Sequence, residues 1–134
     1  MPRLQKCMNI KLYLAAGTGG MFGAIARYGI SVLFGTDHIF PYTTLFINLS
    51  GCFLISFLLY HPSLKQKLSP ELFAAFSVGV IGAFTTFSTF AVETIQLMNS
   101  HMLLAAVYIL LSVAGGILFC MLGFKVASRK WNIQ

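Results

Sequence analysis

The stretch Gly82-Ala83-Phe84-Thr85-Thr86-Phe87-Ser88-Thr89-Phe90 places a helix-weakening glycine and a run of hydroxyl side chains inside an otherwise apolar segment. No formal charge occurs between Glu71 and Glu93, so the segment is long enough to cross a hydrocarbon core of about 30 Å as a helix. Lipid cannot satisfy a hydroxyl group or a freed carbonyl group. Polar groups at this depth therefore indicate a membrane helix that lines a pathway or binds a ligand.

The composition of the whole chain supports a membrane protein. Hydrophobic residues make up 57% of the chain and charged residues only 9%, with a mean hydropathy of +0.83. Soluble domains contain about 25% charged residues. The 134 residues leave no room for a separate soluble domain beside the apolar segments, so residues 1–134 are expected to form one membrane-embedded unit.

The charged residues divide the chain into four apolar spans. The lengths of these spans each fit one tilted helix, and the connections between them are short. We therefore predict an all-α membrane protein with four transmembrane helices at about 12–33, 44–60, 72–98 and 102–126.

The basic residues show a strong bias in their positions. With four spans, all of them except Arg27 fall on one side of the membrane: Arg3, Lys6, Lys11, Lys65, Lys67, Lys125, Arg129 and Lys130. The positive-inside rule then places both termini in the cytoplasm. The net charge of +6 is thus a topology signal rather than a sign of nucleic-acid binding.

Residues for enzymatic chemistry are not evident. No nucleophile, base and orienting partner can be assembled, and no phosphate-binding loop occurs. The cysteines Cys7, Cys52 and Cys120 share no metal-ligand spacing and are interpreted as inert buried thiols. The histidines lie near span ends, where interfacial polar residues are common. We expect a protein that is not an enzyme.

The first span combines close-packing residues with a charge. Gly19 and Gly23 form a G-x-x-x-G step, which lets two helix backbones approach closely in lipid. Arg27 follows deep in the span, where a charge costs a few kcal/mol. Its side chain either extends to the far interface or lines a water-filled vestibule that attracts anions.

Asn48 is the polar residue at the centre of the second span. A lipid-facing amide would leave several hydrogen-bonding groups unpaired, so Asn48 should face another helix or water. One interpretation is a hydrogen bond that joins two helices. The other is a donor in an ion pathway, since the NH2 group can replace water around an anion.

The third span carries the most specific pattern. Phe87 and Phe90 share a helix face, and aromatic ring edges attract an anion without trapping it. Gly79 and Gly82, followed by Thr85, weaken the helix and predict a break. A break would free carbonyl groups, and a buried monovalent cation would satisfy several of them.

Together these residues resemble the Fluc, or CrcB-like, family of fluoride channels, which are small four-span proteins that work as antiparallel dimers. The resemblance covers nearly the whole chain and rests on the segment GGMFGAIARY at residues 19–28, on Asn48 and on the segment TTFSTF at residues 85–90. The third-span motif is highly specific, whereas the glycine pattern alone is weak.

The resemblance implies roles for particular residues. Arg27 would lie near a cytoplasm-accessible vestibule, and Gly82 and Thr85 would offer backbone carbonyls to a structural sodium ion at the dimer interface. Tyr108 and Ser112, four residues apart on the fourth span, are candidate pathway hydroxyls. The complete predicted fluoride pathway comprises Asn48, Phe87, Phe90, Ser88, Thr89, Tyr108 and Ser112.

The predicted function is passive fluoride efflux across the cell membrane. A four-span drug/proton exporter is an alternative, but it would need an intramembrane carboxylate, and Glu93 lies near the end of span three. A non-conducting membrane subunit is the other alternative. The charge bias should fix the orientation of this chain, so we expect a homologous second subunit of opposite orientation, with a homodimer as the alternative.

Overall fold

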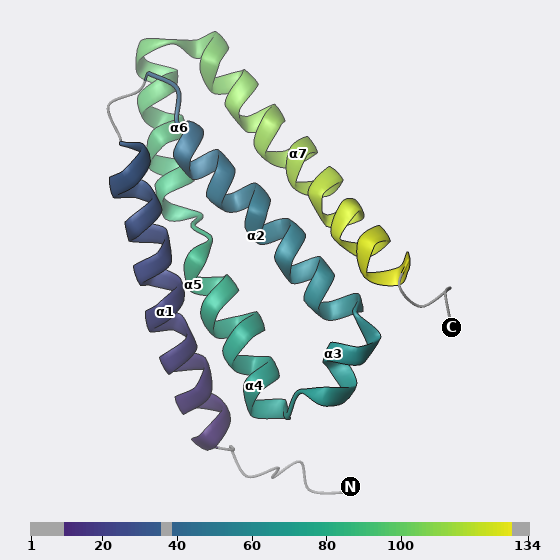
Figure 1. The fold of residues 1–134 in the computed structure, drawn as a ribbon. Helices are drawn as coiled ribbons and strands as arrows, with labels where there is room; N and C mark the ends of the chain where they lie inside the picture. The colour runs from purple at the N-terminus through teal and green to yellow at the C-terminus, as the bar shows by residue number, and fades with distance from the viewer. Residues whose placement is uncertain (1–9, 36–38, 130–134) are drawn as a thin grey trace, which may run out of the picture.

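The computed structural model describes residues 10–35 and 39–129, and every regular element within these ranges is a helix (Figure 1). The all-α class predicted from the sequence is therefore confirmed. Several residues used in the sequence predictions lie outside the described ranges: Arg3, Lys6, Cys7 and Lys130.

Eight helical elements follow one another along these ranges. They are α1 (Ile10–Phe34), α2 (Tyr42–Tyr60), α3 (Pro62–Lys67), α4 (Pro70–Ala74), the π-helical stretch η1 (Ala75–Ile81), α5 (Gly82–Phe84), α6 (Ser88–Ser100) and α7 (Met102–Arg129). The elements α4, η1, α5 and α6 together form the third long helical segment.

Local sequence signals explain the ends of the shorter helices. Gly35 follows α1 with a φ of 71°, a conformation that glycine adopts without a steric penalty. The His61 Nδ1 accepts a hydrogen bond from the Leu64 N–H at 3.4 Å, and the Ser69 hydroxyl accepts one from the Leu72 N–H at 3.3 Å. Each of these capping residues is followed by a proline, which suits the first turn of a helix.

Three helical segments of the described chain are long and apolar enough to cross a membrane: Tyr42–Tyr60, Pro70–Ser100 and Met102–Arg129. The helix α1 has 25 residues and comparable length, but it is not among them. Its lower hydropathy follows from Arg27 and its several glycines. By length and composition the structure thus shows three membrane-capable helices where the sequence predicted four spans.

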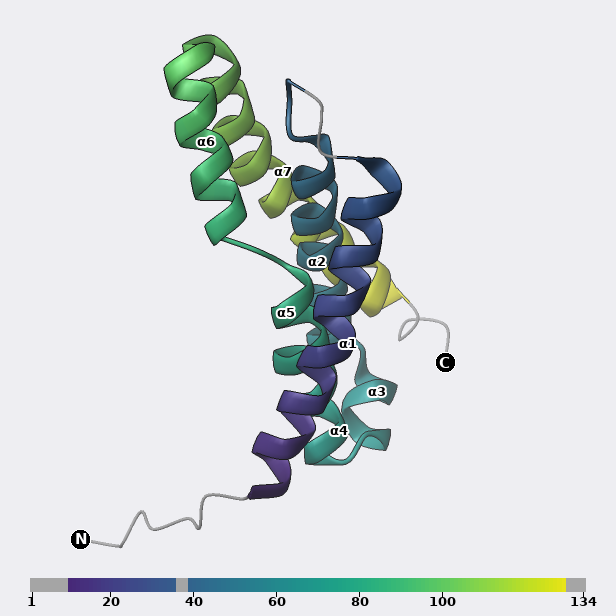
Figure 2. The same cartoon turned by 90° about the vertical axis from the view of Figure 1, so that its left-hand side faces the viewer.

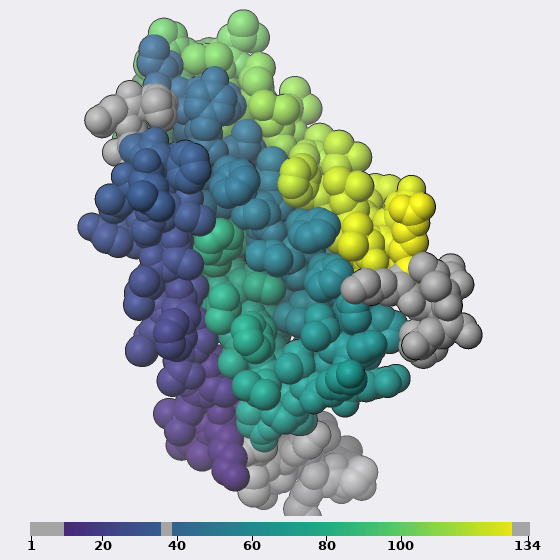
Figure 3. All heavy atoms as spheres, viewed as in Figure 1, coloured from purple at the N-terminus to yellow at the C-terminus, as the bar shows by residue number. Residues whose placement is uncertain are grey.

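The helices form two close pairs. The helix α1 runs along α4, η1 and α5, whereas α2 lies against α7, which also contacts α6 (Figures 1 and 3). The start of α1, the helix α3 and the end of α7 point toward one end of the molecule. The end of α1, the start of α2 and the turn between α6 and α7 lie at the other end (Figure 1).

Glycines explain why α1 and η1 approach so closely. A Cβ atom added at Gly19 would overlap the Ala75 carbonyl, and one added at Gly23 would overlap the Val80 carbonyl. From the opposite side, a Cβ at Gly79 would meet the backbone of α1. The interface between these helices is therefore made by backbone atoms, with no room for a side chain at these three positions.

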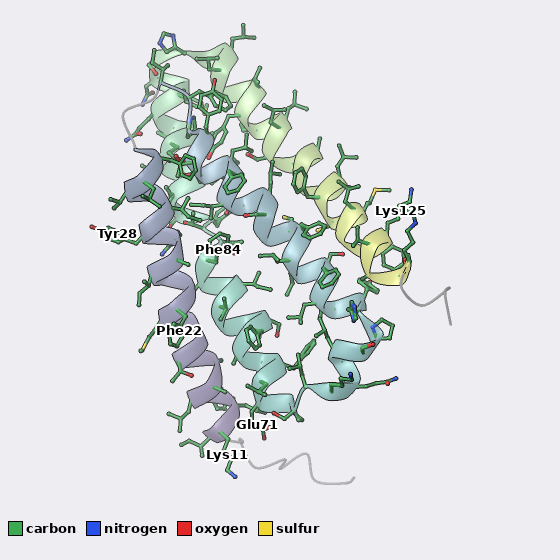
Figure 4. The ribbon with its side chains drawn as sticks, in the orientation of Figure 1. Lys11, Phe22, Tyr28, Glu71, Phe84 and Lys125 are labelled. Carbon is green, nitrogen blue, oxygen red and sulfur yellow. The ribbon has the colours of Figure 1, made fainter. Side chains whose placement is uncertain are left out.

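The opposite faces of the same helices are apolar and exposed. Phe22 and Tyr28 of α1 point away from the bundle and are 67% and 71% exposed (Figure 4). The buried core is small by comparison and centres on Tyr108, which contacts Phe40 and Phe90. Large exposed apolar faces are what a protein in contact with lipid or with a second subunit requires.

Candidate functional site

The third helical segment is interrupted between α5 and α6 (Figure 2). Thr85 has a ψ of 159°, so its backbone is extended, whereas Gly82 keeps helical angles of −63° and −38°. The Thr85 hydroxyl donates back to the Ile81 carbonyl at 3.1 Å. The break thus follows the glycines that weaken the helix and begins at the first hydroxyl residue of the motif.

The break frees backbone carbonyl groups. The Thr86 N–H, which would continue the helix, is bound to a side chain instead, and the Thr89 N–H binds the Thr86 hydroxyl at 3.2 Å. Among the residues that the structure describes, no hydrogen-bond donor reaches the carbonyls of Ala83, Phe84 or Thr85. The Gly82 carbonyl accepts only a long bond of 3.4 Å from the Thr85 hydroxyl. This group of oxygens is available to a cation.

Asn48 holds the break against α2. Its Nδ2 donates to the Thr86 carbonyl at 2.9 Å, and its Oδ1 accepts from the Thr86 N–H at 2.9 Å. The amide therefore satisfies both polar groups of a residue that has left the helix. The structure shows the joining role that the sequence allowed for Asn48. One N–H of the NH2 group has no partner within the described part of the chain and remains available to a solute.

The hydroxyl groups beyond the break form a chain. The Thr86 hydroxyl donates to the Thr89 hydroxyl at 3.0 Å and lies 3.4 Å from the Ser88 hydroxyl. It also accepts from the Thr89 N–H, which would otherwise be unpaired in the first turn of α6. The Thr86 hydroxyl thus binds a backbone N–H in the first turn of α6 and links the hydroxyls of Ser88 and Thr89.

The two aromatic residues of the motif have different surroundings. Their ring centroids are 6.0 Å apart with planes tilted by 45°. Phe87 is 80% exposed, whereas Phe90 is partly buried and its ring lies 5.1 Å from that of Tyr108. Phe87 is therefore free to contact a solute or a second subunit, and Phe90 is also part of the core.

A hollow of about 490 Å³ brings most of the predicted site together. It lies along the break and is bounded by α2, the third helical segment and α7. The predicted residues that line it are Asn48, Gly82, Thr85, Phe87, Phe90 and Ser112. The Ser112 hydroxyl is buried and has no hydrogen-bond partner within the described residues.

Ser88, Thr89, Tyr108 and Arg27 do not line this hollow. Thr89 borders a second hollow of about 290 Å³ near the end of α1 and the start of α2. Tyr108 is fully buried, and Arg27 on α1 is half-buried. The predicted residues are thus distributed over the two hollows and the core, except Ser88 and Arg27, which line neither hollow.

Glu93 lines the second hollow and was not among the site residues predicted from the sequence. Its Oε1 accepts from the Thr44 hydroxyl at 2.8 Å, and its Oε2 accepts from the Tyr108 hydroxyl at 2.8 Å. The carboxylate therefore joins α2, α6 and α7. An acidic residue in an apolar span needs polar partners, and this general rule is the sequence signal that points to Glu93.

A cation at the break would need oxygen ligands from the backbone or from hydroxyls. The described residues contain no group of three or more His, Cys, Asp and Glu side chains that could hold a metal ion. Carbonyl and hydroxyl oxygens suit hard cations. The donor set present at Gly82 to Thr85 consists of such oxygens.

Comparison with known proteins agrees with this geometry. A sequence profile described as "CrcB-like protein, Camphor Resistance (CrcB)" matches residues 14–124. The chain is 49% identical over 110 residues to a protein of Desulfitobacterium hafniense named "Fluoride-specific ion channel FluC 1", covering 81% of this chain and 96% of the relative. It is 41% identical over 122 residues to a Bacillus cereus protein of the same name, covering 89% of each.

A relative with a different name shows similar likeness. It is a Lactobacillus johnsonii protein named "Fluoride-specific ion channel FluC 2", 41% identical over 119 residues, covering 86% of this chain and 95% of the relative. The resemblance inferred from the motifs is therefore confirmed: this chain belongs to the CrcB-like family.

Proposed function

We propose that this chain is a subunit of a fluoride-specific channel that lets fluoride leave the cell passively, and that it is not an enzyme. The observation that carries the proposal is the hollow along the helix break, where Asn48, Phe87, Phe90 and Ser112 come together. Membership of a family whose relatives are named fluoride-specific ion channels supports the same function.

The chemistry of the hollow suits a small, strongly hydrated anion. Fluoride must exchange its water for donors that bind it well enough to admit it and weakly enough to release it. One N–H of Asn48 and the hydroxyl of Ser112, which have no partner among the described residues, are neutral donors. The tilted rings of Phe87 and Phe90 add positive edges without a fixed charge. Ser88, Thr89 and Tyr108 extend this polar path.

We further propose that α1 is the fourth membrane span and that both termini are cytoplasmic. The 25 residues of α1 rise about 37 Å, enough to cross the hydrocarbon core. Lys11 lies at the same end of the molecule as Glu71 (Figure 4), close to the connection that carries Lys65 and Lys67. This distribution supports the positive-inside assignment in the cell membrane. Arg27 would then add positive charge to a vestibule that attracts anions.

A structural sodium ion is proposed at the break, at the interface between two subunits. The carbonyls of Gly82 and Thr85 would be its ligands, and the lack of strong donors to them within residues 10–35 and 39–129 supports the assignment. Replacing sodium with a large organic cation during purification should lower activity and thermal stability. If this replacement changes neither activity nor thermal stability, the assignment is contradicted.

The proposed assembly is an antiparallel dimer with a homologous second subunit of opposite orientation. The one-sided distribution of Lys and Arg residues supports a fixed orientation of this chain. Cysteine labelling at Asn132 and Ser100, in a background lacking Cys7, Cys52 and Cys120, tests this. Termini found in comparable amounts on both sides of the membrane, with this chain expressed alone, would favour a homodimer.

Fluoride-electrode recording of efflux from liposomes tests the function itself. The purified chain is reconstituted with and without a homologous second chain, and a fluoride gradient is the only driving force. Efflux under these conditions supports a channel. Efflux that needs a proton gradient and is lost in Glu93→Gln would favour an exporter, since proton coupling needs an intramembrane carboxylate. No efflux in either reconstitution would favour a non-conducting subunit.

A further inference from the structure

Two cysteines of the described chain face each other across the contact between α2 and α7. The Cys120 thiol donates to the Cys52 carbonyl oxygen at 3.4 Å, so this sulfur atom of α7 lies against the Cys52 backbone of α2. Both cysteines are free and half-buried. From the sequence they were expected to be inert buried thiols, because the cysteines share no metal-ligand spacing.

Neighbouring residues hold the two sulfur atoms in place. A Cβ atom at Gly116, one turn before Cys120, would lie 3.5 Å from the Cys52 sulfur. Ser56, one turn after Cys52, donates to the Cys120 carbonyl at 2.7 Å. The small residue and the interhelical hydrogen bond bring the two helices together at the level of the thiols.

A solute can approach this pair from the hollow along the helix break. Cys52 lies one helical turn after Asn48 and lines the same hollow of about 490 Å³ as Ser112 and Thr86. A small cation that reaches Asn48 is therefore adjacent to the Cys52 thiol. The Cys120 thiol contacts the Cys52 carbonyl oxygen from α7.

The charge of the product decides which cation suits two thiolates between apolar helices. Soft thiolate ligands select soft metals. A monovalent cation would leave a net negative charge at the site, and an uncompensated charge there is costly, whereas a divalent cation gives a neutral product. Zinc prefers four ligands, and no third His, Cys, Asp or Glu joins the pair within the described residues.

We propose that Cys52 and Cys120 form a two-coordinate binding site for a soft divalent cation of the mercury(II) class. Binding breaks two S–H bonds, forms two S–metal bonds and releases two protons for each cation, with no change in oxidation state. The product joins α2 to α7 close to Asn48. Cys52 also lines the hollow of the proposed fluoride path, so the test reads metal binding rather than fluoride flux.

The test uses the purified full-length chain with Cys7→Ser, titrated with mercuric ion in the presence of a competing monothiol. We expect one metal ion per chain, two protons released, thiolate-to-metal ultraviolet absorption that saturates at this ratio, and protection of both cysteines from alkylation. Cys52→Ser and Cys120→Ser should each bind at least about 100-fold more weakly, because the second thiol acts at a high effective concentration.

A matched control keeps two cysteines but separates them. Phe119→Cys combined with Cys120→Ser moves one sulfur by about 100° around α7. Equal mercury affinity in this control and in the native pair would overturn the proposal, as would two metal ions per chain or a serine variant that retains the native affinity. If one serine variant does not fold, the other serine variant and this control still decide the outcome.

Discussion

The two halves of the third helical segment are held in place by different means. The half before the break, α4 to α5, contacts α1 through glycines whose Cα atoms lie against backbone carbonyls. The half after the break, α6, is joined to α2 and α7 through Glu93, which binds Thr44 and Tyr108. The position of the first half depends on close backbone packing, and the position of the second half depends on side-chain hydrogen bonds.

This difference bears on where the two hollows lie. In lipid, glycine contacts bring helices together without exposing polar groups. The smaller hollow lies beside α6, where Glu93 lines it, whereas the hollow along the break is lined by residues of both halves, such as Gly82 before the break and Phe90 after it. The break lies where one mode of packing gives way to the other, and Asn48 binds it there.

The largest expected effect comes from adding a single methyl group to the glycine contact. Gly23→Ala would place a Cβ atom on the Val80 carbonyl, which cannot move away as a flexible side chain can. We expect a loss of about 3 kcal/mol of stability or more, at the upper end of the range for overpacking. Thermal denaturation in detergent, followed by size-exclusion chromatography, measures this effect.

Gly17→Ala and Gly29→Ala are matched controls on the same helix. A Cβ atom at either position meets nothing within 4 Å, so the change should be neutral or slightly stabilising through helix propensity. If Gly23→Ala were as stable as these controls, the contact between α1 and η1 would have to be looser than the structure shows.

Much of the first half could be predicted from sequence, because its signals are local. Glycine spacing on the first span indicates a close helix contact without specifying the partner, and the glycine and threonine sequence indicates a weak point in the third span. The structure adds that Gly19 and Gly23 face Ala75 and Val80 of the same chain.

The site after the break could be predicted only in part. Spacing along one helix shows which residues share a face, but it does not show which residue of another helix lies opposite. Thr44 and Glu93 are hydrogen-bonded although they are far apart in sequence. Cys52 and Cys120 meet for the same reason, and no pattern of spacing within one span could indicate either pair.

The next largest effect is expected for Asn48→Asp, which keeps the shape of the side chain and removes its NH2 group. An ionised carboxylate can still accept from the Thr86 N–H but repels the Thr86 carbonyl. We expect a loss of about 1 to 3 kcal/mol, the cost of an unsatisfied buried group, and at least about a tenfold loss of fluoride efflux.

The protonation state of the new side chain provides an internal check. A protonated carboxyl group regains a donor for the Thr86 carbonyl, so acidic pH should restore part of the lost stability. Native-like efflux from liposomes while the new carboxylate is shown to be ionised would place Asn48 outside the pathway.

Phe87→Ile and Phe90→Ile should lower fluoride efflux while leaving the proposed dimer assembled. Each change removes an aromatic edge and keeps an apolar side chain. Of these two residues, Phe90 packs against Tyr108 whereas Phe87 is largely exposed, so Phe90→Ile should also lower stability by about 1 kcal/mol and Phe87→Ile should not. Wild-type efflux in both variants would remove the aromatic constriction from the proposed pathway.

The smallest effect on stability is expected for Ser112→Ala, which separates pathway chemistry from structural bonding. The Ser112 hydroxyl is buried and unpaired among the described residues, so removing it should leave stability unchanged or slightly higher. If the hydroxyl donates to fluoride in the hollow, efflux should fall by several-fold, the equivalent of about 1 kcal/mol.

Ser56→Ala is the matched control, because the Ser56 hydroxyl donates to the Cys120 carbonyl at 2.7 Å outside the hollow. That variant should lose about 1 kcal/mol of stability with little change in efflux. Liposome efflux and thermal denaturation measured on both variants decide whether the Ser112 hydroxyl belongs to the pathway. A loss of stability without a change in efflux in Ser112→Ala would mean that this hydroxyl is structural.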